Sequence, residues 1–332
     1  MLTTATEARD ALVGDPEGVG PLLVVDLDAG GPVDEVAGLV TALPIVGVGV
    51  ATQPMAAPGP GFDVLVSAVD GGRPWCHCPS GVDGAVATLS AAVDACPQAA
   101  VTLVQVLRLG RGHSLREGLT VESLAYATLQ GGSEHRAWLA AAPARRPAVS
   151  PEPVRLERSG DTLAVTLSRP EVRNAVDAAT RDGLVAAFDV AAQGDLRVEL
   201  RGSGPDFCSG GDLAEFGTTP DPATAHLVRT TRSPARALAA VAGRTTVFLH
   251  GACIGAGIEL AALADRVVAA PDTSIRLPEL AMGLIPGAGG TATIPRRIGP
   301  ERTAWLALTG LLLDAPTAHS WGLVDVIEPE AK

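Results

Sequence analysis

The chain has 332 residues, enough for two domains, and 47% of them are hydrophobic, which suffices for one or two buried cores. Its formal net charge of −12, with no basic stripe, argues against a nucleic-acid partner. No stretch approaches the ~20 consecutive apolar residues of a membrane span, and the N-terminus lacks the apolar segment of a secretory signal, so no membrane partner is expected.

The first predicted elements alternate between buried strands and a helix. Strands are expected at “PLLVVDLD” (21–28), “LPIVGVGVA” (43–51) and “FDVLVSAVDGG” (62–72), with a helix over “VDEVAGLVTAL” (33–43). The following “WCHCPSG” (75–81) holds two thiols and an imidazole, but it lacks the paired spacing of a zinc site, so we expect a loop and no metal. Five scattered cysteines favour a reducing compartment, such as the cytoplasm, over a disulfide scaffold.

From about residue 84 to residue 142 the hydrophobic pattern becomes helical. Helices are expected over 86–95, 98–109, 119–132 and 133–141. The third of them places its predicted apolar face at Val121, Leu124, Ala125, Thr128 and Leu129. Residues 143–153 then read as a linker, because they are rich in proline and poor in large apolar side chains.

Strands and helices alternate again after the linker. “DTLAVTLSRP” (161–170), “LRVELRGSG” (196–204), “RTTVFLHGACIGAG” (244–257) and “DRVVAAP” (265–271) predict strands, and 177–192 predicts a helix. This order is typical of an α/β fold with crossover connections. The sequence therefore predicts an α/β unit at 154–332, preceded by a smaller α/β piece that ends in helices.

Two glycine-rich turns in the second unit lead from strands toward helical starts. “GACIGAGIELAALAD” (251–265) opens a helix on small residues and carries Glu259 among apolar neighbours, and “PDFCSGGDLAEF” (205–216) offers a second such turn. Free N–H groups at these places suit an oxygen that becomes negative during a reaction, and together they suit the two halves of one oxyanion hole. Tight helix–strand packing is the alternative for the first turn, and an ordinary turn for the second. Glu279 lies on a segment that ends at the turn Gly287–Gly290, and its alternative is a surface glutamate.

These residues resemble the enoyl-CoA hydratase/isomerase (crotonase) superfamily from about Val154 to Pro329. The resemblance rests on “LSRPEVRNAV”, “FCSGGDL”, “HGACIGAGIELAALAD”, “LPELAMGLIPGAGGT” and “TGLLLDAPTAHSWGLVDVI”, which together are highly specific. It implies a ββα spiral core, assembly as a homo-oligomer built from trimers, and an acyl-CoA thioester as substrate. No metal or redox cofactor is implied, since CoA arrives as part of the substrate.

The resemblance also assigns the site residues. The backbone N–H groups of Gly211 and Ala256 match the oxyanion donors, although the family more often has glycine at the second position. Glu259 and Glu279 match the two hydratase glutamates, of which one activates water and the other gives a proton to the α-carbon; which glutamate does which is left open. Substrate contacts are expected from a further set of residues: Arg173, Ala175, Ser209, Gly210, Asp212 and Gly287.

The sequence departs from the family pattern in one respect. Helices follow “GLVDVI” in the family, whereas this chain ends just after that stretch. Helices resembling this tail occur instead at 85–142. We therefore interpret 1–142 as a degenerate crotonase-like half with relocated tail helices that cap the core of the same chain or of a neighbour, the alternative being an unrelated domain. Hydration or dehydration of a 2-enoyl-CoA is the expected activity. The alternatives are an acyl-CoA isomerase, hydrolase or decarboxylase, or a non-catalytic assembly partner.

Overall fold

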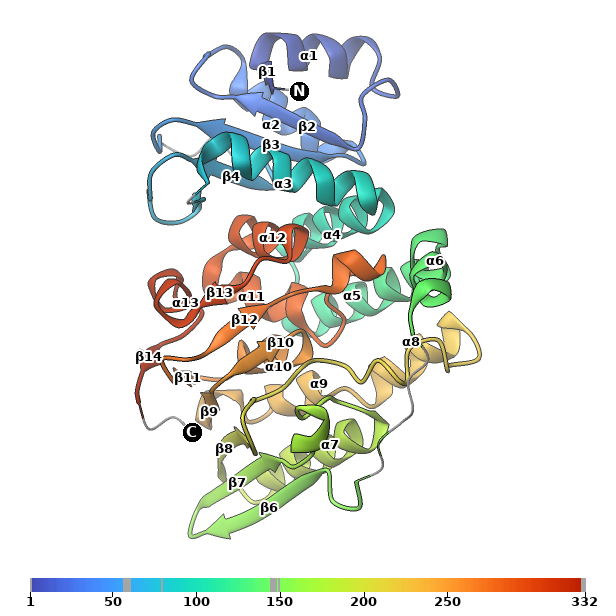
Figure 1. The fold of residues 1–332 in the computed structure, drawn as a ribbon, viewed down its shortest axis with the longest axis vertical. Coiled ribbons are helices and arrows are strands. Elements are labelled where there is room, and N and C mark those ends of the chain that lie inside the picture. The colour runs from blue at the N-terminus through green and yellow to red at the C-terminus, as the bar shows by residue number, and fades with distance from the viewer. Residues whose placement is uncertain (1, 56–60, 79, 144–147, 149, 330–332) are drawn as a thin grey trace.

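The computed structural model describes residues 2–55, 61–78, 80–143, 148 and 150–329. Its N-terminal part is built on a parallel five-stranded sheet in the order β1-β2-β3-β4-β5 (Figure 1). The strands are β1 (Leu2–Thr4), β2 (Leu22–Asp26), β3 (Val46–Ala51), β4 (Val64–Ser67) and β5 (Cys76–His77). The three predicted strands of this part are confirmed. β1 and the helix after it were not predicted, and the expected loop at 75–81 is wrong in part, because Cys76 and His77 pair with β4 as strand β5.

The two faces of this sheet belong to different hydrophobic clusters. Leu23 and Val25 of β2 point to the face covered by α1 (Ala5–Gly14) and α2 (Val33–Ala42). Val24, between them, points to the opposite face, which is covered by α3 (Gly81–Ala95) and α4 (Pro97–Gly110). Because strand side chains alternate, one run of apolar residues serves both faces.

The C-terminal part contains two sheets. The larger has the order β14-β11-β9-β8-β7-β6, with β6 and β7 antiparallel and the other neighbours parallel; the smaller has the order β10-β12-β13. The large sheet comprises β6 (Val154–Ser159), β7 (Thr162–Leu167), β8 (Arg197–Gly202), β9 (Thr245–Leu249), β11 (Arg266–Ala269) and β14 (Val326–Ile327). The small sheet comprises β10 (Ala252–Ile254), β12 (Ser274–Arg276) and β13 (Leu313–Asp314). The chain alternates between the sheets, from β9 to β10 and from β11 to β12.

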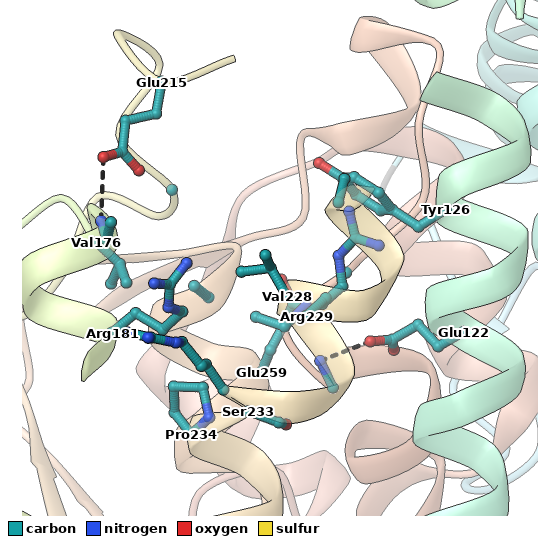
Figure 2. A pocket seen from close by; sticks show the side chains of 18 of the residues that line it. Glu122, Tyr126, Val176, Arg181, Glu215, Val228, Arg229, Ser233, Pro234 and Glu259 are labelled. Carbon is teal, nitrogen blue, oxygen red and sulfur yellow. Dashed lines mark hydrogen bonds between the residues drawn. The ribbon is translucent and has the colours of Figure 1, made fainter. Parts of the chain in front are cut away.

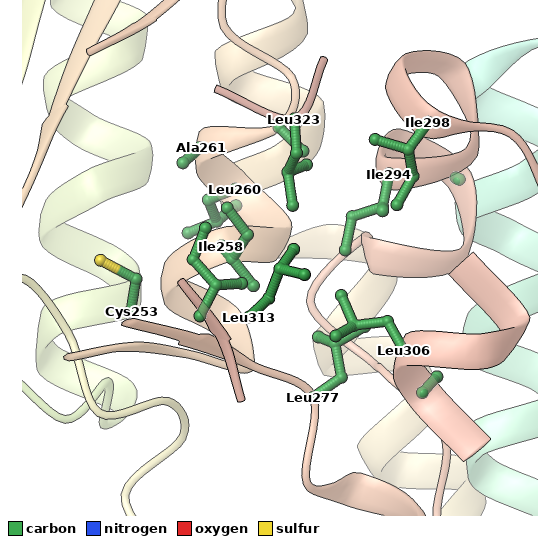
Figure 3. Packing of buried hydrophobic residues seen from close by; sticks show 14 of the residues in the cluster. Cys253, Ile258, Leu260, Ala261, Leu277, Ile294, Ile298, Leu306, Leu313 and Leu323 are labelled. Carbon is green, nitrogen blue, oxygen red and sulfur yellow. The ribbon is translucent and has the colours of Figure 1, made fainter. Parts of the chain in front are cut away.

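Helices fill the space around these sheets. They are α7 (Ala178–Gln193), α8 (Pro222–Thr231), α9 (Pro234–Ala239), α10 (Ala256–Ala261), α11 (Gly290–Ile298), α12 (Pro300–Thr309) and α13 (Ala315–Trp321), with short 3₁₀ turns at Pro170–Val172 (η1), Ala242–Arg244 (η2) and Glu279–Met282 (η3). Figure 3 shows the interior where Ile258 of α10, Ile294 of α11 and Leu306 of α12 converge. This apolar interior anchors α10, the helix that carries Glu259.

The N-terminal helices pack directly on the C-terminal part. α5 (Leu115–Gln130) contacts α8 and α11, α4 contacts α11 and α12, and α3 contacts α12, while α6 (Ser133–Ala141) contacts η3. One hydrophobic cluster joins Leu103 and Leu119 of the N-terminal helices to Ile298 and Leu306. In Figure 1 these helices lie between the N-terminal sheet and the large sheet. The predicted linker, 143–153, falls partly outside the described residues.

The predicted buried face of α5 is only partly confirmed: Leu129 is buried, and Val121 and Ala125 are half-buried and pack against the core. Leu124 is 52% exposed and Thr128 is exposed too, whereas Leu119, Tyr126 and the polar Glu122 are buried. Apolar side chains occur on both sides of this helix, so hydrophobic spacing alone does not settle its rotation. The polar partners that α5 finds in the C-terminal part decide which side is buried.

Within the described residues, no single helix is long and apolar enough to cross a membrane; α3 and α4 reach that composition only together, and they meet at 109°. The described residues also contain no group of three metal-ligating side chains, and all five cysteines are unpaired.

Candidate functional site

A cavity of about 290 Å³ lies between α5 and the C-terminal part (Figure 2). It is lined by α5, the start of α7, the loop after β8, α8, α9, α10, η3 and the turn that precedes α11. Of the residues predicted from the sequence, the structure brings six together around this space: Gly211, Asp212, Ala256, Glu259, Glu279 and Gly287.

The two glycine-rich turns are held side by side by backbone pairing. Cys208 and Cys253 form a parallel bridge, in which Cys208 N–H donates to Ala252 O (3.1 Å) and Ile254 N–H donates to Cys208 O (2.9 Å). The chain leaves this bridge as Gly211 on one side and Ala256 on the other. The pairing therefore sets the relative positions of the two predicted donor turns.

The N–H groups of Gly211 and Ala256 have no acceptor among the described residues. Ala256 is the first residue of α10, where an N–H has no intrahelical partner. Its φ is not positive, so alanine fits at this position. The positive φ falls on the preceding Gly255 (φ 49°), where a Cβ would also come within 2.4 Å of Glu279 Oε1. Two free N–H groups thus border the cavity beside a carboxylate.

Glu259 is 2% exposed, and its Oε2 accepts hydrogen bonds from Ala288 N–H (2.7 Å) and Gly290 N–H (2.9 Å). Burial raises the pKa of Glu259 to about 7, while the two backbone N–H groups act in the opposite direction. A carboxyl group with this proton affinity exchanges a proton readily near neutral pH.

Glu279 begins η3 and faces the same cavity. Its Oε2 is buried and has no hydrogen-bond partner in the structure. Burial, followed by the charge of Glu259, raises the pKa of Glu279 well above its ordinary value. The two carboxyl groups therefore have distinct environments: backbone donors stabilise the charge on Glu259, whereas the unpaired oxygen of Glu279 favours the neutral acid.

A third carboxylate, Glu122 of α5, also lines the cavity, and our sequence analysis did not include it. Burial and the charge of Glu259 raise its pKa to about 8. The signal that points to it is its spacing, since Leu119, Glu122, Ser123 and Tyr126 follow one another at helical intervals on the buried face. A buried glutamate needs hydrogen-bond partners, and here those partners are at the N-terminal end of α11.

Four predicted substrate contacts, Arg173, Ala175, Ser209 and Gly210, are not among the residues that line the cavity. The Arg173 side chain is 59% exposed and pairs with Asp206 (2.6 Å). Asp212 does line the cavity, but its carboxylate pairs with the buried Arg169 (3.0 Å). Contact of these residues with substrate stays a prediction.

The C-terminal part is similar in sequence to known proteins. The family model described as enoyl-CoA hydratase/isomerase matches residues 157–332. A probable enoyl-CoA hydratase of Rhodobacter capsulatus is 36% identical over 173 residues, covering 52% of this chain and 66% of that protein. The 2,3-dehydroadipyl-CoA hydratase of Escherichia coli is 34% identical over 178 residues, covering 52% and 68%.

The crystal structure of an enoyl-CoA hydratase from Thermoplasma volcanium superimposes with a TM-score of 0.50 at 33% identity, covering 54% of this chain and 72% of that one. The expected α/β core with a crotonase-like fold is therefore confirmed. The chain spans 64% to 66% of the length of three of the curated relatives that it matches. The matched region begins after α6, so all the N-terminal helices, including α5 with Glu122, lie outside it.

Proposed function

The chain belongs to the enoyl-CoA hydratase/isomerase (crotonase) family, and we propose that it adds water to, or removes water from, the 2,3-double bond of an acyl-CoA thioester. The observation that carries this proposal is the convergence of two glutamates and two free backbone N–H groups on one cavity: Glu259 is buried, and Glu279 is half-buried with a buried, unpaired Oε2. Relatives named as hydratases support the same reaction class.

In the proposed reaction the thioester oxygen accepts hydrogen bonds from Gly211 N–H and Ala256 N–H. The oxygen gains negative charge when C3 is attacked, because an enolate forms. Donors fixed in advance by the Cys208–Cys253 pairing stabilise that charge without having to reorient.

The environments of the glutamates assign their roles in this scheme. Glu259, ionised near neutral pH, takes a proton from water as the oxygen of that water bonds to C3. Glu279, held neutral, donates its proton to C2, so that one water molecule is added in total. After the product leaves, Glu259 gives its proton to solvent and Glu279 takes one up, which restores the starting protonation states. The reverse reaction uses the same groups with their roles exchanged. The glutamates carry every proton in this scheme, so no cofactor enters beyond the CoA of the substrate.

Hydration of crotonyl-CoA, followed as loss of the absorbance of the conjugated thioester, tests the proposal. We expect activity to fall below about pH 7, as Glu259 becomes protonated, and to fall again at higher pH as Glu279 loses its proton. A 3-enoyl-CoA serves as the comparison substrate. Conversion of the 3-enoyl-CoA without any hydration would favour an isomerase, and inactivity on both substrates and on longer 2-enoyl-CoAs would contradict the proposal.

Gly211→Pro is expected to lower kcat by about 10²–10³-fold or more, since proline removes one of the two oxyanion donors. The fold should survive, because Gly211 N–H makes no bond within the described residues. Gly211→Ala is the matched control: it keeps the N–H, and its Cβ would lie 3.2 Å from the Phe216 ring, which needs only a small adjustment. Steady-state kinetics of both variants, with circular dichroism as a check of folding, test whether Gly211 N–H is an oxyanion donor. Wild-type turnover by folded Gly211→Pro would remove this N–H from the oxyanion hole.

A further inference from the structure

Glu122 is 2% exposed although it comes from α5, outside the part of the chain that matches the family. Its Oε1 accepts a hydrogen bond from Gly289 N–H (2.7 Å). Its Oε2 accepts two more, from Thr291 N–H (2.8 Å) and Thr291 Oγ1 (2.7 Å). Both oxygens act as acceptors, so these three hydrogen bonds favour the ionised carboxylate and partly oppose the burial and the charge of Glu259, which raise its pKa.

The same turn also binds Glu259, through its remaining N–H groups. Ala288 and Gly290 donate to Glu259, whereas Gly289 and Thr291 donate to Glu122, so four successive N–H groups alternate between two carboxylates. Figure 2 shows Glu122 reaching this turn from the side of α5. A displacement of the turn toward or away from one glutamate therefore changes its distance to the other.

Glycine allows this close approach. Gly289 has a φ of 118°, a conformation that other residues rarely adopt. A Cβ on Gly290 would come within 2.7 Å of Glu259 Cγ. The turn is thus packed directly against the catalytic side chain, and its position fixes where Glu259 Oε2 lies.

Placing two carboxylates on one turn is electrostatically unfavourable, because each raises the pKa of the other. A neutral Ser, Thr or Asn would cap the start of α11 without this repulsion. Arg229 offsets part of it: its guanidinium lies 4.2 Å from the centre of the Tyr126 ring and donates to Ser123 O and Ser123 Oγ, next to Glu122. Helix capping alone therefore does not account for the Glu122 carboxylate at the start of α11.

We propose that Glu122 is a positioning residue: by binding Gly289 and Thr291 it fixes the turn whose other N–H groups orient Glu259 for catalysis. The N-terminal helices then contribute to the reaction itself and do not only cover the core. This inference rests on the proposed function, because it assigns Glu259 a catalytic role.

The test compares Glu122→Gln with Glu134→Gln. Glu134 is a matched control in the same N-terminal part: its carboxylate accepts from Gln98 N–H (2.7 Å) and Ala99 N–H (3.0 Å) at the start of α4. It lies outside the cavity lining. Both substitutions remove a carboxylate from a helix start, but only Glu122→Gln places an amide group opposite the turn that holds Glu259.

For Glu122→Gln we expect kcat to fall on the order of 10²-fold, as for other small displacements of a catalytic group, with little change in KM. Glu134→Gln should keep wild-type kcat and pH profile. Should Glu122→Gln fail to fold, Glu122→Asp keeps the charge on a shorter side chain, and its kcat is expected to lie between those of wild type and Glu122→Ala.

Amide hydrogen exchange, measured by NMR, supplies a readout that does not depend on activity. Positioning predicts faster exchange in Glu122→Gln at Ala288 and Gly290 as well as at Gly289 and Thr291, and no change there in Glu134→Gln. Unchanged exchange at Ala288 and Gly290 would overturn the inference, whatever happens to kcat, as would equal losses of kcat in the two variants. An inactive wild-type protein with the expected exchange pattern would refute the proposed function alone.

Discussion

Glu259→Gln is expected to lower kcat for hydration by about 10²–10⁴-fold, because the amide cannot take a proton from water. KM should change little, since the residue acts on the reacting atoms and not on the CoA. Glu279→Gln should cause a loss of the same order by removing the acid that protonates C2. Steady-state kinetics on the substrate turned over by the wild-type protein give both numbers.

Glu157→Gln, a substitution of an exposed glutamate on β6, serves as the control and should leave kcat unchanged. The two active-site variants should remain folded, because glutamine keeps the size of the buried side chain. Near-native turnover by either one would remove that glutamate from the proposed mechanism.

A fragment comprising 154–332 is expected to be insoluble or aggregated, although it contains both proposed catalytic glutamates and both proposed oxyanion donors. Its helices α11 and α12 would lose the apolar cover of α3, α4 and α5. Burying a leucine contributes ~1.5–3 kcal/mol, so losing several such contacts consumes most of a typical stability of ~5–15 kcal/mol. The measurement is the solubility of the 154–332 fragment on expression, with and without a co-expressed 1–142 fragment. Co-expression of 1–142 should restore part of that solubility.

Truncation could also cause aggregation by a route other than loss of the interface between α5 and the C-terminal part. A matched pair of substitutions on α5 distinguishes the two causes. Leu119→Asp places a charge on the buried face, whereas Leu124→Asp places it at a position that is 52% exposed. Only the first should strongly lower the midpoint of thermal unfolding. A soluble, active 154–332 fragment would instead show that the N-terminal part is an independent appendage.

The motifs of the C-terminal part predicted six residues that the structure brings to one cavity, and for three of them the reason is local. Gly211 lies in a glycine-rich turn, and Ala256 and Glu259 lie in the helix that follows another, so both turns and the glutamate among apolar neighbours are visible in the sequence. Glu279 was predicted from the family resemblance, and the structure brings it to the same cavity. Their catalytic roles remain predictions that the variants above test.

Glu122 was missed because its importance depends on a contact between segments far apart in the chain. Its partners are Gly289, the residue before α11, and Thr291, in the first turn of α11, and the sequence near Glu122 does not indicate them. The same long-range contact explains the error in the rotation of α5, since a polar stripe is buried only where it finds donors and acceptors. The derivation of residues 1–142 from a second crotonase-like unit likewise stays a hypothesis: the structure shows a five-stranded parallel sheet there, but not its ancestry.

The order of the elements along the chain has a consequence for synthesis on the ribosome. α4 and α5 are made before α11 and α12, the helices against which they pack. At roughly 5–20 residues per second, the stretch from Pro143 to the end of α12 takes roughly 10–30 s to translate. During that interval β3 can cover the sheet-facing side of α4, and α8 can cover part of α5 once it has been made, but the sides of α4 and α5 that contact α11 and α12 have no partner. The nascent chain therefore carries an exposed apolar surface until most of the C-terminal part has emerged, which makes this surface a natural substrate for chaperones that act during translation.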